Sequence, residues 1–236
     1  MHALLLAAGR GERLRPLTDR LAKPLLEAGG RRLIEWQIEA LVRAGIGDLV
    51  INTAHLAQQI EDTLGDGRRY GARIRYSREG DRAEDALETL GGIVRALPWL
   101  GGAPFVVASS DIVTDFDYAQ LFGAAERIRA GAWDAHLVLV ENPPYHAGGD
   151  MDAVALEGGE PPLRAVHAAA GGAYTYANIG VLAPRLFDGL AAQRARLFPW
   201  LYGAVQRGRV SAQLHRGRWW NVGTAQELAR VNEEIS

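Results

Sequence analysis

The first 130 residues alternate short apolar runs with amphipathic segments, and this alternation constrains the fold more than any other feature. Apolar runs lie at residues 2–7, 49–53 and 104–109, with a shorter one around 73–77. A strand that is apolar on both faces has to be covered on both faces, which is typical of a parallel sheet between two layers of helices. The pattern therefore predicts an α/β fold.

Helical segments separate these runs. Residues 33–44 place five aliphatic side chains on one helical stripe, and Gly45 follows as a stop signal. Further helices are expected at about residues 55–64, 91–97 and 117–130. In a sheet of this type the ligand-binding cleft is expected at the carboxyl ends of the central strands.

The pattern changes after about residue 135. Strands are expected at residues 136–140, 152–156 and 177–182, with fewer helices between them, which indicates antiparallel additions to the sheet. Glycines and prolines at 143–162 are interpreted as loops and turns rather than as a domain boundary.

Composition disfavours several classes of function. Lysine and arginine total 26 against 28 acidic residues, so the net charge of -2 gives no overall basic field for nucleic acid or an anionic membrane. The sequence has no cysteine, which excludes disulfides and zinc–thiolate sites and fits a reducing cytoplasm. The apolar run at residues 3–8 is too short for a signal peptide or a transmembrane helix, so we expect a buried strand there.

A small and basic segment directly follows the first strand: LAAGRGERLRPLTDRLAKPL, residues 6–25. Gly9 and Gly11 allow positive φ and let backbone N–H groups approach a ligand. Successive amides in such a turn form an anion-binding concavity. Arg13 and Lys23 are able to offset the charge of a polyphosphate. The segment is a candidate phosphate site, and a surface turn with incidental arginines is the alternative.

Two other phosphate motifs do not match. The dinucleotide pattern GxGxxG fails because Leu14 stands at the third glycine position, and no acidic residue ends a second strand about 20 residues later. The P-loop pattern GxxxxGK[ST] does not occur. An NAD-dependent enzyme is therefore disfavoured.

The longer pattern resembles the signature of the sugar-1-phosphate nucleotidyltransferase family: L-A-A-G-x-G-x-R-L-x-P-L-T at residues 6–18, then K-P-L at 23–25. The resemblance implies a Rossmann-like three-layer α/β/α fold with a mostly parallel mixed central sheet. It implies one domain, residues 1–236, with a nucleotide-binding half over about 1–135 and a sugar-phosphate-binding half over about 136–236.

The family joins an NTP to a sugar-1-phosphate and releases pyrophosphate. The resemblance gives the catalytic residues as Arg13 and Lys23, which stabilise phosphate charge, with Asp111. Asp111 follows the strand at 104–109 and resembles the family's metal-binding aspartate, with Mg²⁺ as the implied cofactor. Serine precedes it where the family has glycine, and a turn-capping role for Asp111 is the alternative.

The second implied metal ligand lies in RGRWWNVGT, residues 216–224. The family commonly has aspartate where this chain has Asn221, whose amide oxygen can still bind Mg²⁺ but carries no charge. Thr224 is expected to be the N-cap of the last helix.

Residues 86–92, ALETLGG, resemble the family's base-reading turn. The alternative is that Gly91 and Gly92 merely begin a helix, and the acidic turn is compatible with uracil, thymine or guanine. The resemblance implies these nucleotide-binding residues: Leu6, Ala8, Gly9, Gly11, Arg13, Lys23, Glu88, Thr89, Gly91 and Gly92.

The acceptor side is implied by two stretches. The loop NPPYHAGGD carries Asn142, His146 and Asp150, and Asn178 lies on a later strand. The resemblance suggests sugar-phosphate contacts for Asn142, Asp150 and Asn178, whereas His146 is more typical of a solvated surface residue.

Within the family, the stretches at 52–80 and 86–101 resemble small uridylyltransferases that act on N-acetylmuramate-1-phosphate in bacterial peptidoglycan recycling. This implies UTP as donor, small-molecule partners, no nucleic acid or membrane, and a cytoplasmic monomer or small homo-oligomer. The alternatives are a guanylyltransferase for mannose- or heptose-1-phosphate and a nucleotide-sugar-binding regulatory subunit without turnover, the latter motivated by Ser110 and Asn221.

Overall fold

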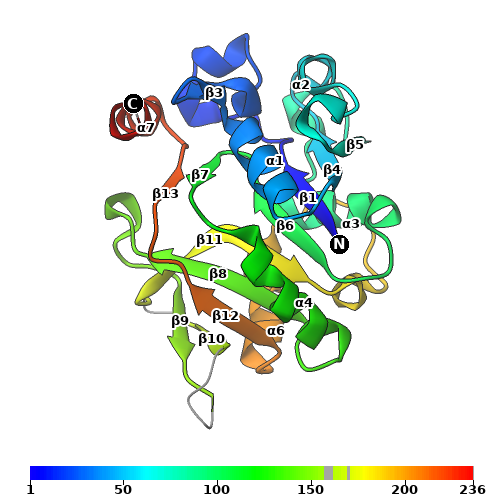
Figure 1. The fold of residues 1–236 in the computed structure, drawn as a ribbon, viewed down its shortest axis with the longest axis vertical. Helices are drawn as coiled ribbons and strands as arrows, with labels where there is room; N and C mark the ends of the chain where they lie inside the picture. The colour runs from blue at the N-terminus through cyan, green and yellow to red at the C-terminus, as the bar shows by residue number, and fades with distance from the viewer. Residues whose placement is uncertain (157–161, 169–170, 236) are drawn as a thin grey trace.

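The computed structural model describes residues 1–156, 162–168 and 171–235. Its centre is a nine-stranded mixed sheet with the strand order β5-β4-β1-β6-β11-β8-β12-β10-β9 (Figure 1). The strands are β1 (His2–Leu6), β4 (Asp48–Thr53), β5 (Arg73–Arg78), β6 (Phe105–Ser109), β8 (Ala135–Glu141), β9 (Met151–Val154), β10 (Leu163–His167), β11 (Tyr174–Leu182) and β12 (Val210–Leu214). Two small sheets pair β2 (Glu27–Ala28) with β3 (Arg31–Arg32), and β7 (Ile112–Thr114) with β13 (Trp219–Asn221).

The first half of the sheet is parallel, as its apolar runs predict. β5, β4, β1 and β6 pair in parallel, and Leu4 of β1 aligns with Val50 and Val107 on the strands beside it. β11 then runs antiparallel to β6 and β8, which confirms the antiparallel additions. The second half is more antiparallel than a mostly parallel sheet would be, because β9 and β10 also run against their neighbours, while β12 pairs in parallel with β8.

Helices cover both faces of the sheet. They are α1 (Leu33–Arg43), α2 (Ala57–Leu64), α3 (Glu88–Leu100), α4 (Leu121–Arg129), α5 (Leu197–Trp200), α6 (Tyr202–Gln206) and α7 (Ala225–Glu234). Ala3 and Leu5 of β1 belong to a core with α1, α2 and α4, whereas Leu4 belongs to a second core with α3, α5 and α6. Alternate residues of a strand face opposite sides, so both helix layers are anchored on the same strands. Figure 1 shows α1 and α4 in front of the sheet and α6 behind it. The three-layer fold is confirmed.

Several expected boundaries move. The helix expected at 91–97 begins at Glu88, so the turn expected at 86–92 contains the first turn of α3. The helix expected at 117–130 is a 3-10 turn at Tyr118–Gln120 followed by α4, and the strand expected at 152–156 ends at Val154. Residues 157–161, within the expected loop region 143–162, lie outside the described residues.

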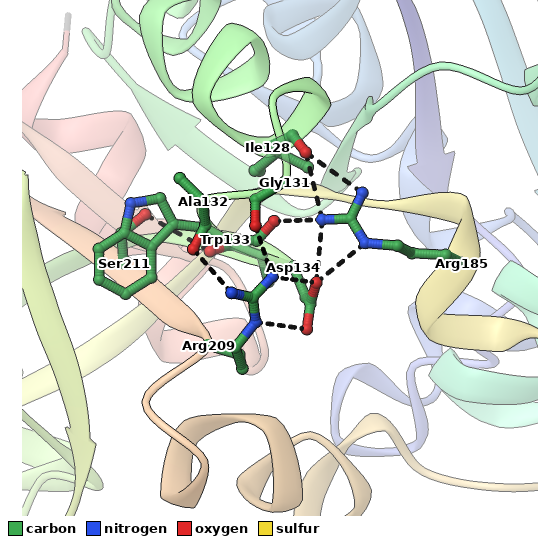
Figure 2. A network of polar contacts seen from close by, with 9 residues as sticks. Ile128, Gly131, Ala132, Trp133, Asp134, Arg185, Arg209 and Ser211 are labelled. Atoms are coloured by element: carbon green, nitrogen blue, oxygen red, sulfur yellow. Dashed lines mark hydrogen bonds and ion pairs between the residues drawn. The ribbon is translucent and has the colours of Figure 1, made fainter.

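A partly exposed charge network fastens the second half of the sheet (Figure 2). Asp134, just before β8, accepts hydrogen bonds from Arg209 at 3.1 and 3.0 Å and from Arg185 Nε at 3.0 Å. The same two guanidinium groups donate to the backbone carbonyls of Gly131 at 2.8 Å and Ile128 at 3.2 Å. Because Arg209 precedes β12 and Arg185 follows β11, one carboxylate ties three strand ends together.

The last helix packs partly against residues from the beginning of the chain. α7 contacts β2 and contributes Val231 to a small core with Leu26, Ala28 and Leu33. Thr224 Oγ1 accepts a hydrogen bond from Glu227 N at 3.2 Å, which confirms its N-cap role. None of the described helices combines the length and hydropathy that a bilayer span requires.

Candidate functional site

A cavity of about 630 Å³ opens at the carboxyl ends of β1, β4 and β6, where the topology predicts a cleft. Its described lining residues are Leu6, Ala7, Ala8, Gly9, Arg10, Gly11, Glu12, Lys23, Pro24, Asn52, Ala83, Glu84, Ala86, Glu88, Thr89, Ser109, Ser110, Asp111 and Arg194. The cavity therefore brings together the glycine-rich loop, Lys23, Asp111 and the start of α3, as the sequence analysis expected for a single site.

The glycine-rich loop turns sharply after β1. Gly11 has a φ of +73°, and an added Cβ would lie 3.0 Å from Thr18 Cγ2 and 3.1 Å from Lys23 Cδ. Thr18 Oγ1 also donates to the Gly11 carbonyl at 2.8 Å. Gly9 has no heavy atom within 4 Å of a built Cβ, so open space lies beside its backbone. Gly11 is needed for the turn itself, whereas Gly9 leaves the loop open toward the cavity.

The basic residues of the loop have different surroundings. Arg10 pairs with Asp19 at 2.9 Å and with Glu12 at 3.0 Å, so its charge is offset locally. Arg13 is exposed and reaches the segment after β13, where a Cβ on Gly223 would lie 2.6 Å from Arg13 Nη2. Arg13 is not among the described residues that line the cavity, and its guanidinium group lies against Gly223 instead.

Lys23 and Asp111 form an ion pair in the wall of the cavity. Their side chains are 14% and 20% exposed, respectively. Lys23 begins a 3-10 turn, Lys23–Leu25, and Asp111 follows β6. Ser110 N donates to the Leu6 carbonyl at 3.1 Å, which fixes the turn of Asp111 beside the start of the glycine-rich loop.

Two oxygen atoms beside this pair fit a hard cation. Asp111 Oδ1 and Asn221 Oδ1 are buried without a hydrogen-bond partner among the described residues. Val222 N donates to the Asp111 carbonyl at 2.9 Å, and Asn221 on β13 pairs with Ile112, the residue after Asp111. Buried oxygens without a donor are costly unless a ligand uses them, and oxygens are what Mg²⁺ prefers. The described residues hold no group of three or more His, Cys, Asp and Glu side chains fit for a metal, so a cation here would need further oxygens from its substrate or water.

The start of α3 carries a backbone conformation that is rare outside glycine. Glu88 has a φ of +59°, and its carboxylate lies 3.5 Å from Arg194 Nη2 and 4.0 Å from Arg196 Nε. Glu88 and Thr89 both line the cavity. A strained residue at the rim of a cavity is a frequent feature of ligand sites.

Gly91 and Gly92 have a packing role that the turn-based interpretation missed. Both are buried within α3 and are not among the described residues of the cavity wall. A Cβ on Gly91 would collide with the Gln193 carbonyl, and one on Gly92 would lie 2.5 Å from Glu79 Oε1. The two glycines therefore let a loop and a carboxylate approach the helix.

A second cavity of about 220 Å³ adjoins the first, with Leu6, Glu88, Thr89 and Ser109 in both walls. Its other lining residues are Val107, Tyr176, Asn178, Arg196, Leu197 and Phe198. Asn178 has a φ of +57° and lies at an irregularity in β11 between Tyr176 and Gly180. Asparagine tolerates this conformation better than most residues. Asn178 thus lines a cavity beside that of the glycine-rich loop, and its contact with an acceptor stays a prediction.

Asn142 and Asp150 fasten their loop to the start of β11. Asn142 Nδ2 donates to the Gly172 carbonyl at 2.8 Å, and its Oδ1 accepts from Thr175 Oγ1 at 2.9 Å. Asp150 Oδ1 accepts from Tyr176 N at 3.2 Å, and burial raises the pKa of its carboxyl. His146 is 3.8 Å from Asp150. The Asn142 amide is thus engaged on both sides within the protein.

Sequence reasoning missed Asn52, Arg194 and Arg196, which line the two cavities. Asn52 had a usable signal, because a polar residue at the carboxyl end of the apolar run 49–53 lies at the same sheet edge as the glycine-rich loop. The arginines had none, since their position depends on how a loop over 100 residues away packs on α3.

Comparison with known proteins agrees with this geometry. A family model described as nucleotidyl transferase matches residues 2–236. The N-acetylmuramate alpha-1-phosphate uridylyltransferase of Neisseria meningitidis serogroup B is 44% identical over 97% of this chain and 95% of the relative. The enzyme of that name from Caulobacter vibrioides is 30% identical over 95% of this chain and 92% of the relative. The crystal structure of apo UDP-glucose pyrophosphorylase superposes with a TM-score of 0.77 at 17% identity, covering 99% of this chain and 97% of that one, which supports the fold alone.

Proposed function

This chain belongs to the nucleotidyl transferase family and is a sugar-1-phosphate nucleotidyltransferase, and from that premise we propose that it joins UTP to N-acetylmuramate α-1-phosphate. The products are UDP-N-acetylmuramate and pyrophosphate. The observation that carries this proposal is the 44% identity over nearly the whole chain to a uridylyltransferase of that specificity. The cavity of about 630 Å³, with a glycine-rich loop and a lysine in its wall, supports a nucleoside triphosphate as one substrate.

In the proposed reaction a phosphate oxygen of the acceptor attacks the α-phosphorus of UTP. The bond from the α-phosphorus to the bridging oxygen breaks, and pyrophosphate leaves with that electron pair. The nucleophile belongs to the substrate, so no serine, cysteine or general base of the protein is required. The chain has to bring two polyanions together and neutralise their charge, which is a task of positioning and electrostatics.

The cations around the cavity suit this task. Lys23 is the only lysine of the sequence and contributes a point charge beside the glycine-rich loop. Arg13, whose guanidinium group lies against Gly223 outside the cavity wall, would add a second positive charge for the phosphates. Asp111 and Asn221 would hold Mg²⁺ through their unpartnered oxygens, and the bound ion would supply further positive charge for the phosphates.

The adjoining cavity of about 220 Å³ supports a muramic acceptor. N-acetylmuramate differs from N-acetylglucosamine by a lactyl ether that ends in a carboxylate. Arg196 lines this cavity together with Asn178, so a guanidinium group is available for that carboxylate. A neutral sugar would leave this cation without a substrate partner.

The test is an activity panel with the purified protein. Pyrophosphate release is measured with Mg²⁺ for UTP, GTP, dTTP and CTP, each against the 1-phosphates of N-acetylmuramate, N-acetylglucosamine, glucose and mannose. We expect the pair UTP and N-acetylmuramate-1-phosphate to exceed every other by about tenfold or more in kcat/KM. A preference for GTP would refute the uridylyl assignment, and inactivity with every pair would favour a regulatory subunit.

The acceptor assignment has a separate test. Arg196→Ala is expected to raise the KM for N-acetylmuramate-1-phosphate by about tenfold, which is the loss of one charge-assisted contact. The KM for N-acetylglucosamine-1-phosphate should change by less than about twofold. Arg207→Ala, which removes an exposed arginine after α6, is the matched control. Equal changes for both acceptors would contradict recognition of the carboxylate.

A further inference from the structure

A continuous chain of hydrogen bonds joins two walls of the nucleotide cavity through residues that the proposed mechanism does not use. Asn52 Oδ1 accepts from Ala7 N at 2.7 Å, at the start of the glycine-rich loop. Asn52 Nδ2 donates to Glu79 Oε1 at 2.7 Å, and Glu79 Oε2 accepts from Leu87 N at 2.6 Å. Leu87 directly precedes Glu88 and Thr89, which line the cavity.

The side chains that form these hydrogen bonds have little room to move. Asn52 is 3% exposed. Glu79 N is itself held by the Thr53 carbonyl at 2.7 Å. Gly92 gives the pair its space, since a Cβ there would lie 2.5 Å from Glu79 Oε1 and 2.7 Å from Asn52 Nδ2. A buried amide and a half-buried carboxylate that satisfy each other in this way favour one geometry, because a displacement leaves a polar group unpaired.

We propose that Asn52 and Glu79 are positioning residues that set the separation between the glycine-rich loop and the Leu87–Thr89 segment, and thereby the fit of the nucleotide. Neither residue acts on the reacting phosphates. Asn52 lines the cavity, and Glu79 acts through the Leu87 backbone. The inference rests on the proposed nucleotide site but not on the identity of the acceptor.

Because one residue of the pair is an amide and the other a carboxylate, the two groups can be exchanged between positions 52 and 79. In Glu79→Gln the side chain keeps one acceptor oxygen, so Asn52 Nδ2 and Leu87 N no longer both find one. In Asn52→Asp a second carboxylate faces Glu79. In the double variant Asn52→Asp/Glu79→Gln, Asp accepts from Ala7 N and from the Gln amide, and the Gln oxygen accepts from Leu87 N. Each group again has a partner: the bond between positions 52 and 79 has its donor and acceptor exchanged, and the negative charge moves from position 79 to position 52.

We expect each single variant to raise the KM for UTP by about tenfold while kcat falls less than about threefold. Preference for UTP over CTP and GTP should fall as well, and the KM for the acceptor should stay within about twofold. The double variant should recover most of the KM and the preference. Glu61→Gln is the matched control, because Glu61 is a half-buried carboxylate near Thr53 and Arg78 that does not join the two walls.

Binding of UTP and Mg²⁺ measured by calorimetry without acceptor gives an independent readout. Single variants that lower only the melting temperature, with the KM for UTP unchanged, would overturn the proposal. So would an equal rise in both KM values, or a double variant no better than the singles. If the single variants do not fold, the double variant alone tests the proposal. It must fold, and its dissociation constant for UTP must lie within about threefold of the wild-type value. A wild type that binds GTP instead would refute the uridylyl assignment, and the same series then tests the pair with GTP.

Discussion

Lys23 and Asp111 stand 88 residues apart in sequence and form an ion pair in the cavity wall. The pair leaves Asp111 Oδ1 without a partner among the described residues, beside the equally unpartnered Asn221 Oδ1. The carboxylate thus has one oxygen engaged by a cation of the protein and one available to a ligand.

Asp111→Asn is expected to lower turnover by about 100- to 1000-fold, because it removes the one charged oxygen available to Mg²⁺ at this position. Pyrophosphate release measures the effect, and differential scanning calorimetry should show a folded protein. Asp115→Asn serves as the control, since Asp115 is exposed and pairs only with His215 and Arg218 among its described contacts. Wild-type turnover in Asp111→Asn would contradict the proposed metal role.

Asn221→Asp is expected to lower the Mg²⁺ concentration for half-maximal activity by about fivefold or more, because a second carboxylate strengthens binding of a divalent cation. The measurement is a Mg²⁺ titration of pyrophosphate release at saturating substrates. An unchanged Mg²⁺ requirement would argue against Asn221 as a ligand. An inert wild type that gains activity through this substitution would instead support the regulatory-subunit alternative.

Asp134→Asn is expected to destabilise the protein by about 2 kcal/mol at pH 7, since two guanidinium groups lose their carboxylate. The hydrogen bond from Arg209 is the main cause that lowers the pKa of Asp134 below its ordinary 3.8. The stabilisation is therefore present above pH 3.8 and disappears as the pH falls through the lowered pKa. Urea unfolding of both proteins from pH 7 to pH 3 should show the difference between their free energies of unfolding becoming smaller.

Asp66→Asn is the control for that experiment, because Asp66 is 61% exposed and pairs with the exposed Arg68. Its free energy of unfolding should change by less than about 0.5 kcal/mol. A gap between wild type and Asp134→Asn that persists undiminished at pH 3 would contradict the assigned role of the network.

His136 is expected to make the protein sensitive to mild acid. Burial lowers the pKa of its ring to about 4, and its nitrogens lie 2.9 Å from Ser211 Oγ and 3.0 Å from Gln213 Oε1. The unfolded ring takes up a proton near pH 6.5 and the folded ring only near 4, so stability falls as the pH drops through this interval. Urea unfolding at pH 7, 6, 5 and 4 measures how steeply the free energy of unfolding falls as the pH drops, and His136→Gln should reduce this dependence. If the substitution leaves the pH dependence unchanged, titratable groups other than His136 cause it.

The sequence by itself determined the features that depend on neighbours in the chain. The apolar runs of β1, β4 and β6 and the stripe of α1 identified the parallel half of the sheet, because burial on one or both faces leaves a local period. The glycine-rich loop and the Thr224 cap were equally readable, since a tight turn or a helix start requires particular residues within a few positions.

The tertiary structure alone decided which distant residues meet. Arg13 against Gly223, Asn52 with Glu79, and Arg196 beside Asn178 join segments whose proximity follows from the order of strands in the sheet. The tertiary structure also decides that the Asn142 amide binds the segment at Gly172 and Thr175, and that Gly91 lies against the carbonyl of Gln193. A hydrogen bond or close contact depends on separations of tenths of an ångström, and no local period encodes such a separation between segments far apart in the chain.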